Sequence, residues 1–449
     1  MTKPRGEFGS RLGFILAAAG SAVGLGNIWG FPTQAASNGG AAFVLVYLIL
    51  AFLLAYPVLM AELLIGRHAH GNAVTALTRI ASSPISKAIG ASTGLMGIVV
   101  ASLILSFYAI VAGWMLGFTA SYPLNAAGIT AAGQWLTAFS AERNVALMVI
   151  FMGMTAGIVM AGVHNGIERW STRLMPSLIV TLVLLALYVL TLDGAMTGLK
   201  VYLLPDFSKV LSGDLILAAL GSAFFSLSLG VGTMLIYGSY LSDKEDLPST
   251  GAQVALIDVG IAILAGFLIM PSMYVAAERG VEIFDASGAL LSEDTLIFTV
   301  LPALFDTLGG IGILIATAFF FLMSVAALTS SISMLEVPVA FLVERFGWTR
   351  RRSALMAGTG IALISTIVIM NFDALFGLVI AVTTRFGQPL GGLLMCVYAG
   401  WIWQRNSLLG ELRKSNPDAA NTFFWRVWPL YVRVVCPVII GVIFVRSVL

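Results

Sequence analysis

The sequence has little charge, few cysteines and few histidines. Only 10% of its 449 residues are Asp, Glu, Lys or Arg, compared with about 25% in ordinary soluble domains. The formal net charge of +2 provides no basic surface of the kind that nucleic-acid binding requires. Cys396 and Cys436 both lie in apolar segments, where a thiol is usually a small buried apolar group. These scarcities argue against a disulfide framework and against a Cys/His zinc site.

Apolar residues dominate the sequence instead. They make up 59% of the chain, and the mean hydropathy is +0.97. Apolar runs of about 20 residues are long enough to cross the hydrocarbon core of a bilayer as helices. We therefore predict an all-α polytopic membrane protein with about eleven transmembrane helices. The predicted spans are 11–36, 41–68, 88–123, 145–162, 167–192, 213–241, 251–277, 307–343, 353–371, 374–404 and 425–447.

The distribution of basic residues predicts how the chain lies in the membrane. If alternate connections fall on opposite sides, seventeen of the 24 Lys and Arg residues lie on the N-terminal side and five on the other. Because Lys and Arg favour cytoplasmic loops, we expect residues 1–10 to be a cytoplasmic N-terminus. An odd number of spans then places the C-terminus outside.

Two of the predicted spans are unsuited to a continuous helix. The first contains SAVGLGN (Ser21 to Asn27), with three glycines nearby, and the sixth contains FFSLSLGVG (Phe224 to Gly232). The interruptions lie at corresponding positions of two five-span halves, 11–192 and 213–404, followed by an eleventh helix at 425–447. Broken helices at matched positions indicate a transporter site near the bilayer midplane. Close packing of small residues between helices is the alternative explanation.

Polar residues inside other spans point to a cation. Thr329, Ser330, Ser331 and Ser333 lie deep in the eighth span, and Asp258 lies in the seventh with no Lys or Arg within a turn. A carboxylate in the membrane is costly, so we expect Asp258 to face a cation or a proton path. The hydroxyls have an alternative, because Ser and Thr often bond back to their own helix. Carboxylate, hydroxyl and carbonyl oxygens suit a hard cation.

Three motifs resemble the neurotransmitter:sodium symporter family. They are RLGFILAAAGSAVGLGNIWGFP (Arg11 to Pro32), FFSLSLGVGTMLIYGSY (Phe224 to Tyr240) and ALTSSIS (Ala327 to Ser333). The resemblance implies two inverted five-helix repeats with unwound helices 1 and 6. With eleven spans, where the family usually has twelve, the chain resembles the bacterial amino-acid transporter branch. This resemblance implies a location in the bacterial inner membrane.

The resemblance also implies two Na⁺ sites. The first would comprise the carbonyl of Ala22 with Asn27, Ser226 and Asp258, together with the substrate carboxylate. The second would comprise the carbonyls of Gly20, Val23 and Ala326 with the hydroxyls of Thr329 and Ser330. Ala262 stands where many chloride-independent relatives have a glutamate. Because the Asp258 carboxylate would place a compensating charge directly on the ion, we expect transport to be independent of chloride.

An amino-acid substrate would lie between the two broken helices. Its carboxylate would meet the amides of Leu25 and Gly26 and the Tyr108 hydroxyl, and its amino group would meet Ala22, Phe225, Ser226 and Ser228. Its side chain would be lined by Ile104, Tyr108, Phe225, Val231, Ser330 and Met334. This apolar lining, with Val231 where relatives often have a bulkier aromatic residue, implies a neutral, medium-to-large apolar or aromatic substrate.

The gates follow the family only in part. Relatives close the outer vestibule with an arginine and an aspartate, but Gly30 and Phe376 occupy these places here. Arg385 either forms a structural pair with an acid or with exposed carbonyls, or it replaces the vestibule arginine or contacts the substrate. Arg5, Tyr240 and Glu344 match the cytoplasmic gate.

We therefore predict sodium-coupled amino-acid symport by alternating access, with no organic cofactor. A proton-coupled antiporter or exporter on the same fold is the alternative. An intramembrane enzyme is disfavoured, because no catalytic constellation has a convincing spacing.

Overall fold

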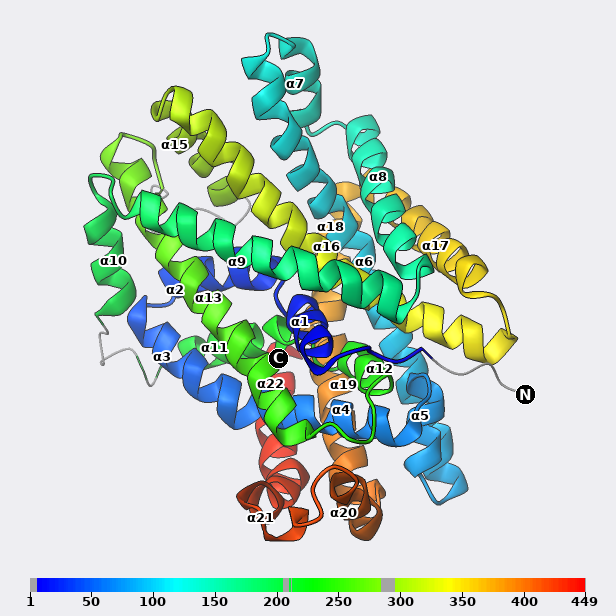
Figure 1. Ribbon diagram of the computed structural model, residues 1–449. Helices are drawn as coiled ribbons and strands as arrows, with labels where there is room; N and C mark the ends of the chain where they lie inside the picture. The colour runs from blue at the N-terminus through cyan, green and yellow to red at the C-terminus, as the bar shows by residue number, and fades with distance from the viewer. Residues whose placement is uncertain (1–5, 205–209, 211, 284–294, 449) are drawn as a thin grey trace.

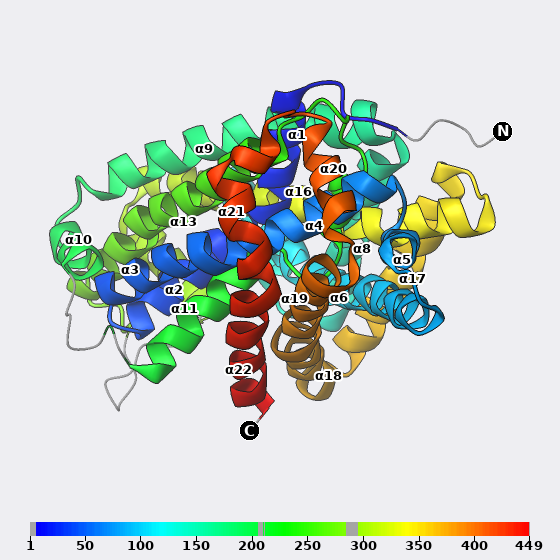
Figure 2. The ribbon, with the colours of Figure 1, turned by 90° about the horizontal axis from the view of Figure 1, so that it is seen from below.

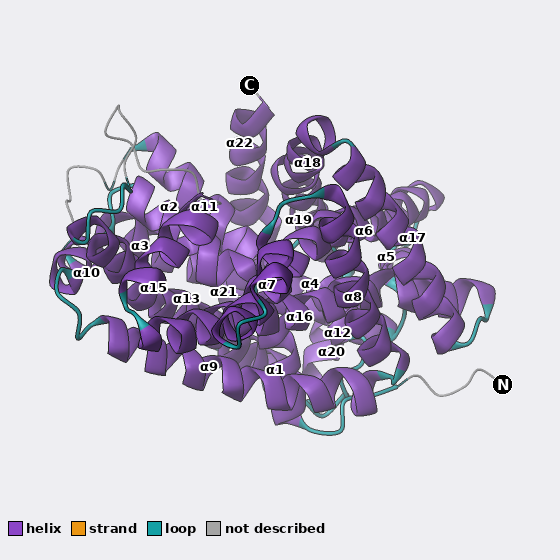
Figure 3. Cartoon of the chain, turned by 90° about the horizontal axis from the view of Figure 1, so that it is seen from above, coloured by secondary structure: helices purple, strands orange, loops and turns teal. Residues whose placement is uncertain are grey.

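The long apolar runs of the sequence form helices (Figure 1), and the described part of the chain contains no strand (Figure 3). The structure is a computed structural model that describes residues 6–204, 210, 212–283 and 295–448. Within these residues nine helices are long and apolar enough to cross a membrane, and a tenth span results if one bent pair of helices is counted as a single span. The prediction of an all-α polytopic membrane protein is thereby confirmed.

The nine continuous spans lie close to nine of the predicted ranges, and several contain π-helical segments, labelled η. The spans are α3 (Ala41–Leu50), η2 (Ala51–Ala55) and α4 (Tyr56–Ala69); α6 (Pro84–Ala126); α8 (Ala141–Met160); η3 (Val163–Glu168) and α9 (Arg169–Val189); α13 (Leu247–Glu278); α16 (Gly310–Phe346); α17 (Arg350–Met370); α18 (Phe372–Ile380), η5 (Ala381–Gly387), α19 (Gln388–Val397) and η6 (Tyr398–Ile402); and α21 (Phe423–Leu430), η8 (Tyr431–Val435) and α22 (Cys436–Val448). Shorter helices between spans are α5 (Ala73–Ile80), α7 (Thr130–Thr137), α10 (Ala195–Leu203), η4 (Leu296–Val300), α15 (Leu301–Thr307), α20 (Arg405–Arg413) and the 3₁₀ turn η7 (Ala419–Asn421).

The first predicted span is broken in its middle. Helix α1 (Arg11–Ala22) ends, and η1 (Gly26–Gly30) with α2 (Phe31–Ser37) continues at an angle of 57°. The N–H of Gly24 donates to Oδ1 of Asn27, so it does not close a helical hydrogen bond to the carbonyl of Gly20. The break therefore frees backbone groups that a continuous helix would pair internally.

The sixth predicted span, 213–241, is also broken. Helix α11 (Gly213–Ser226) is separated from α12 (Thr233–Gly238) by turns. In these turns Ser228, Gly230 and Gly232 have φ values of +52°, +81° and +82°, which a right-handed helix does not permit. Helix α11 is shorter than a full membrane crossing. The two broken spans, the first and the sixth, therefore account for the difference between the eleven predicted spans and the nine continuous long helices.

The broken helices lie inside a shell of continuous ones. Figure 1 shows α1 near the middle of the view, where it packs on α9, α13 and α16. Helices α6 and α16 cross and form the most extensive helix contact in the described chain. In Figure 2 the last two spans run antiparallel beside each other, with α20 and α21 at one end and α18 and α22 at the other. The two breaks face each other, because the Ser228 hydroxyl donates to the carbonyl of Ser21 and the Asn27 side chain donates to the Ser226 hydroxyl.

Candidate functional site: two oxygen clusters and a pocket at the helix breaks

The two broken helices and α13 meet at a buried polar cluster. Asp258 of α13 is fully buried, and its carboxylate accepts hydrogen bonds from the Ser226 hydroxyl and from Nδ2 of Asn27, each at 2.7 Å. The same Nδ2 atom lies 2.8 Å from Oγ of Ser226 and 3.3 Å from the backbone oxygen of Asp258. Three oxygen atoms therefore converge on one nitrogen atom.

This cluster contains a carboxylate without a basic partner. Within the described residues, no Lys, Arg or His forms an ion pair with Asp258. The hydroxyl of Tyr47, which is also buried, lies 3.3 Å from Oγ of Ser226 and extends the cluster to α3. A buried carboxylate needs a compensating charge, and the arrangement of oxygen atoms could supply a cation with hard ligands.

A second oxygen cluster joins the end of α1 to α16. The Ser330 hydroxyl lies 3.3 Å from the carbonyl oxygen of Gly20 and 3.2 Å from that of Val23. The hydroxyl of Thr329 donates to the carbonyl of Ala326 at 3.0 Å and to the carbonyl of Val325 at 3.2 Å. The structure thus brings together the five residues that the family resemblance assigns to the second sodium site.

Three of the four hydroxyls in this part of α16 bond to their own helix. Ser331 and Ser333 donate to the carbonyls of Ala327 and Ser330, and the Thr329 bonds described above are of the same kind, so for these three the back-bonding alternative describes the structure. Ser333 also accepts a hydrogen bond from the Ser21 hydroxyl at 2.6 Å. Of the four hydroxyls, Ser330 is the one that bonds to carbonyls across the break in α1.

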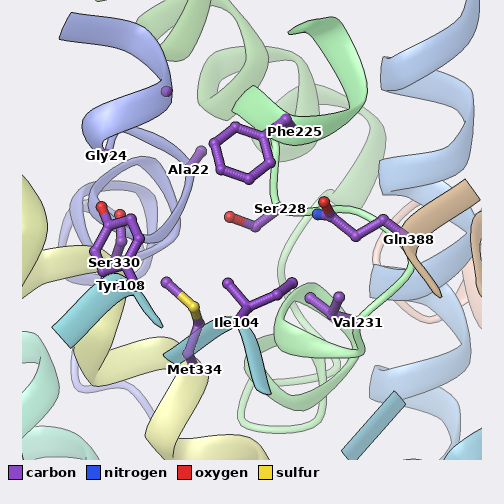
Figure 4. Close-up of a pocket in the computed structure, with 11 residues that line it drawn as sticks. Ala22, Gly24, Ile104, Tyr108, Phe225, Ser228, Val231, Ser330, Met334 and Gln388 are labelled. Carbon is purple, nitrogen blue, oxygen red and sulfur yellow. The ribbon is translucent and has the colours of Figure 1, made fainter. Parts of the chain in front are cut away.

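A small pocket lies beside the two clusters (Figure 4). The N–H of Leu25 donates to the Tyr108 hydroxyl at 3.0 Å, and the Ser228 hydroxyl donates to the carbonyl of Ser21 at 3.0 Å. A Cβ atom on Gly24 would lie 2.6 Å from both Oγ of Ser330 and the Tyr108 hydroxyl. Only glycine at position 24 therefore allows these side chains to approach the unwound backbone.

Most of the residues assigned to the substrate site line this pocket. Its volume is about 20 Å³, so the side chains must shift before an amino acid can enter. Leu25 lines the neighbouring cavity instead, and Ser226 lies in the Asp258 cluster. The pocket is lined by Ala22, Gly24, Gly26, Ile104, Tyr108, Phe225, Ser228, Val231, Ser330, Met334 and Gln388. Gly24 and Gln388 line the pocket although neither was predicted from the sequence to do so.

A wider cavity of about 490 Å³ adjoins the pocket and shares Gly26, Tyr108 and Phe225 with it. Its wall is aromatic at the place where the family resemblance implies a gating ion pair. Phe376 stacks on Phe372 with ring centroids 4.4 Å apart and lies 6.1 Å from the ring of Trp114. Gly30 lines the same cavity. Arg385 is exposed on η5 and does not line either cavity.

The predicted cytoplasmic gate residues have several partners. Arg5 lies outside the described residues. The Tyr240 hydroxyl donates to Glu336, which also forms an ion pair with Arg350, while Glu344 accepts hydrogen bonds from the backbone and side chain of Asn72.

Glu62 and Glu336 are buried glutamates of the spans that were not predicted from the sequence as site residues. Glu336 joins Tyr240 to Arg350 as described above. Glu62 of α4 accepts hydrogen bonds from the backbone N–H groups of Gly230 and Leu235, which the break in the sixth span leaves unpaired. Both are carboxylates inside apolar spans. The criterion that singled out Asp258, the high cost of a carboxylate in the membrane, would also have singled out these two residues.

Comparison with known proteins gives the same picture. The profile of the sodium:neurotransmitter symporter family matches residues 5–126 and 120–449. The chain is 34% identical to a sodium-dependent transporter, YhdH, of Bacillus subtilis, with 98% of this chain and 97% of the relative aligned. It is 31% identical to a sodium-dependent transporter of Haemophilus influenzae, with 99% and 98% aligned.

A solved structure is similar along the whole chain. The crystal structure of MhsT in complex with L-phenylalanine is 36% identical, covers 99% of this chain and 100% of its own, and superposes with a TM-score of 0.85. The predicted fold and the prediction that the chain is a transporter and not an enzyme are confirmed. With matching motifs, fold and family profile, the chain belongs to the sodium:neurotransmitter symporter family.

Proposed function

We propose that this protein transports a neutral, medium-to-large apolar or aromatic amino acid together with Na⁺, by alternating access and without chloride. The observation that carries the proposal is the convergence of three oxygen atoms, from Ser226 and Asp258, on the side-chain nitrogen of Asn27. The N–H group stands in for a cation as the positive partner of these oxygens. A Na⁺ ion there would pair with the Asp258 carboxylate and receive hard oxygen ligands.

The second cluster supports a second Na⁺ ion. The carbonyls of Gly20 and Val23 are aimed at Ser330 because α1 ends between them. Half-helix ends with freed carbonyls are suited to cation binding in transporters. Sodium-dependent relatives at 34% and 31% identity support the choice of ion.

The pocket supports an amino acid as the substrate. Backbone groups at the breaks offer partners for a carboxylate and an amine, while Ile104, Val231 and Met334 offer an apolar wall. A solved relative with 36% identity is bound to L-phenylalanine, which supports an apolar or aromatic side chain.

Charge balance supports independence of chloride. Asp258 brings a negative charge directly to the first cluster, and Ala262, one turn further along α13, is fully buried and has no group that could bind an anion. A carboxylate at this place supplies the compensating charge that an anion would otherwise provide.

The protein has its N-terminus in the cytoplasm and its C-terminus outside, on the basis of the excess of Lys and Arg on the N-terminal side. Residues 11–192 and 213–404 form the two inverted repeats. In this orientation the aromatic cavity opens outward, and the Tyr240, Glu336 and Arg350 contacts close the cytoplasmic side.

The proposal is tested by thermal unfolding of the purified protein with each amino acid, in sodium chloride and in choline chloride. A ligand stabilises the folded state by RT ln(1 + [L]/Kd), so we expect an amino acid and Na⁺ to stabilise it together more than the sum of their separate effects. Undiminished high-affinity binding in choline would exclude symport. Counterflow driven by a pH jump without sodium would favour the antiporter instead.

A further inference from the structure

Gln388 is a polar side chain at one end of the substrate pocket. It is the first residue of α19 and is only 4% exposed. Figure 4 shows its carboxamide reaching into the pocket toward Ser228, on the side opposite Tyr108 and Ser330. Its neighbours across the pocket are apolar, since Ile104, Val231 and Met334 form the adjoining wall.

The position of Gln388 is fixed by close packing of backbones. A Cβ atom on Gly230 would lie 2.1 Å from the carbonyl oxygen of Gln388, and a Cβ atom on Gly391 would lie 1.9 Å from the carbonyl oxygen of Gly230. Helix α19 therefore touches the unwound segment of the sixth span directly. This contact holds the Gln388 side chain next to Ser228 and Val231.

The oxygen atom of the Gln388 carboxamide is available to accept a hydrogen bond. Its Nε2 atom lies 3.5 Å from the carbonyl oxygen of Leu229, so the donor side of the amide already has a partner in the protein. Within the part of the chain that the structure describes, no group donates a hydrogen bond to Oε1. Because Oε1 is not among the buried polar atoms without a partner, it is open to the pocket that Gln388 lines. A ligand that fills this space without a donor leaves the oxygen unpaired and away from water, which is unfavourable, so a ligand that brings a donor to Oε1 is favoured.

The small side chain of Val231 leaves space for a substrate side chain to reach Gln388. Within the apolar wall, the Val231 side chain lies on the side nearest Gln388 in Figure 4, and it is smaller than an aromatic ring. A substrate whose carboxylate lies near Tyr108 therefore extends its side chain past Val231 toward the carboxamide.

We infer that Gln388 is a specificity-determining residue, whose Oε1 atom accepts a hydrogen bond from a donor on the aromatic ring of the substrate. The preferred substrates are then aromatic amino acids that carry such a donor, a phenol hydroxyl or an indole N–H. This inference rests on the proposed amino-acid transport and adds the chemical class of the side chain. A site that hydrogen-bonds a substrate group discriminates against the analogue that lacks it.

The inference is tested with two matched pairs of ligands on wild-type protein and on Gln388→Met, which keeps the length of the side chain and removes its amide. The pairs are tyrosine with phenylalanine, and tryptophan with 3-benzothienylalanine, in which sulfur replaces the indole N–H. Binding affinities are measured in sodium by thermal shift or ligand competition. In at least one pair we expect the wild-type protein to favour the donor-bearing ligand by roughly fivefold, and Gln388→Met to abolish that preference while leaving the affinity for the other ligand within about twofold.

A purely structural role for Gln388 gives a different result. If the side chain only ties α19 to Leu229, Gln388→Met lowers all affinities alike and leaves the ratios unchanged, which would overturn the inference. Equal wild-type affinities within both pairs would overturn it as well.

Gln388→Glu serves if the methionine variant does not fold, because it keeps an acceptor and loses the N–H donor. We expect it to retain the preference for the donor-bearing ligand, and loss of that preference would contradict the inference. Gln134→Met, at an exposed position of α7, is the matched control and should leave both ratios unchanged. If no amino acid stabilises the wild-type protein in sodium, the proposed function fails. If amino acids bind with sodium but the ratios do not depend on residue 388, only this inference fails.

Discussion

Replacing Asp258 by asparagine tests the charge at the centre of the proposed first sodium site. The change keeps the size of the side chain and one oxygen atom, but it removes the negative charge that Asn27 and Ser226 now contact at 2.7 Å. Two opposite unit charges about 4 Å apart attract by about 4 kcal/mol at an effective dielectric constant of about 20. Burying a carboxylate costs several kcal/mol by itself, and the asparagine avoids that cost.

The balance predicts two opposite effects on stability. Without sodium, Asp258→Asn should unfold at the same temperature as the wild-type protein or at a higher one, because a buried unpaired charge has been removed. With sodium, we expect the loss of the Coulomb attraction, part of which the neutral amide oxygen recovers as a ligand, to raise the Kd for Na⁺ roughly 10- to 100-fold.

The assay is a sodium titration followed by thermal unfolding, with choline as the replacement cation and gluconate as the replacement anion. Asp193→Asn, at an exposed position between α9 and α10, is the control and should behave as the wild-type protein does. We expect wild-type uptake to be unchanged in gluconate. The double variant Asp258→Asn with Ala262→Ser should become sensitive to chloride, because a hydroxyl would then lie one turn from a neutral residue 258. A wild-type affinity for sodium in Asp258→Asn, or a loss of uptake by unmodified protein when chloride is replaced, would show that Asp258 does not carry the charge of the first sodium site.

Three further predictions concern the pocket, the bundle end at α20 and the tenth span. Val231→Phe should weaken transport of aromatic amino acids at least tenfold more than transport of alanine, because the larger ring overlaps the substrate side chain; equal losses in competitive uptake assays would place residue 231 outside the pocket. Burial by itself raises the pKa of Glu411, but hydrogen bonds from His68 and Lys414 and the charge of Arg67 lower it to about 2. Because the folded-state pKa lies below the ordinary value of 4.5, the carboxylate stabilises the fold above about pH 4.5 and loses this effect as the pH falls toward 2. Glu411→Gln should therefore destabilise the protein by about 3–5 kcal/mol at pH 7 and by less near pH 3, as measured by thermal unfolding; an equal loss at both pH values would contradict the assignment. Because Arg385 is exposed and lines neither cavity, Arg385→Ala should leave uptake within about twofold of the wild-type value at normal expression; a large loss of uptake would instead support the vestibule role.

The sequence predicted the parts of the site that have a local signal. Glycines near Ser21 and the Ser/Gly cluster before Gly232 predicted both breaks, since neither segment favours a continuous helix. The isolated acid Asp258 predicted a buried polar cluster, because a carboxylate in lipid requires partners. The family resemblance supplied the particular ligand sets.

Other contacts of the site could not be predicted from the residues next to them in the sequence. Gln388 follows an apolar run and a π-helical segment, and nothing in its neighbourhood shows which way its side chain turns. The absence of the gating ion pair was predicted from Gly30 and Phe376. The aromatic wall that stands in its place was not, because it joins Phe376 to Trp114, more than 250 positions earlier in the sequence.

The sequence by itself determined the membrane class, the spans and the places where two helices break, because hydropathy and backbone preference act within a few turns of the chain. The tertiary structure decided which polar groups meet. Ser330 bonds to carbonyls 307 and 310 residues away, and Asn27 meets Asp258 across 231 residues. Such contacts depend on the rotation and tilt of each helix within the bundle, and these follow from the packing of all the side chains around it.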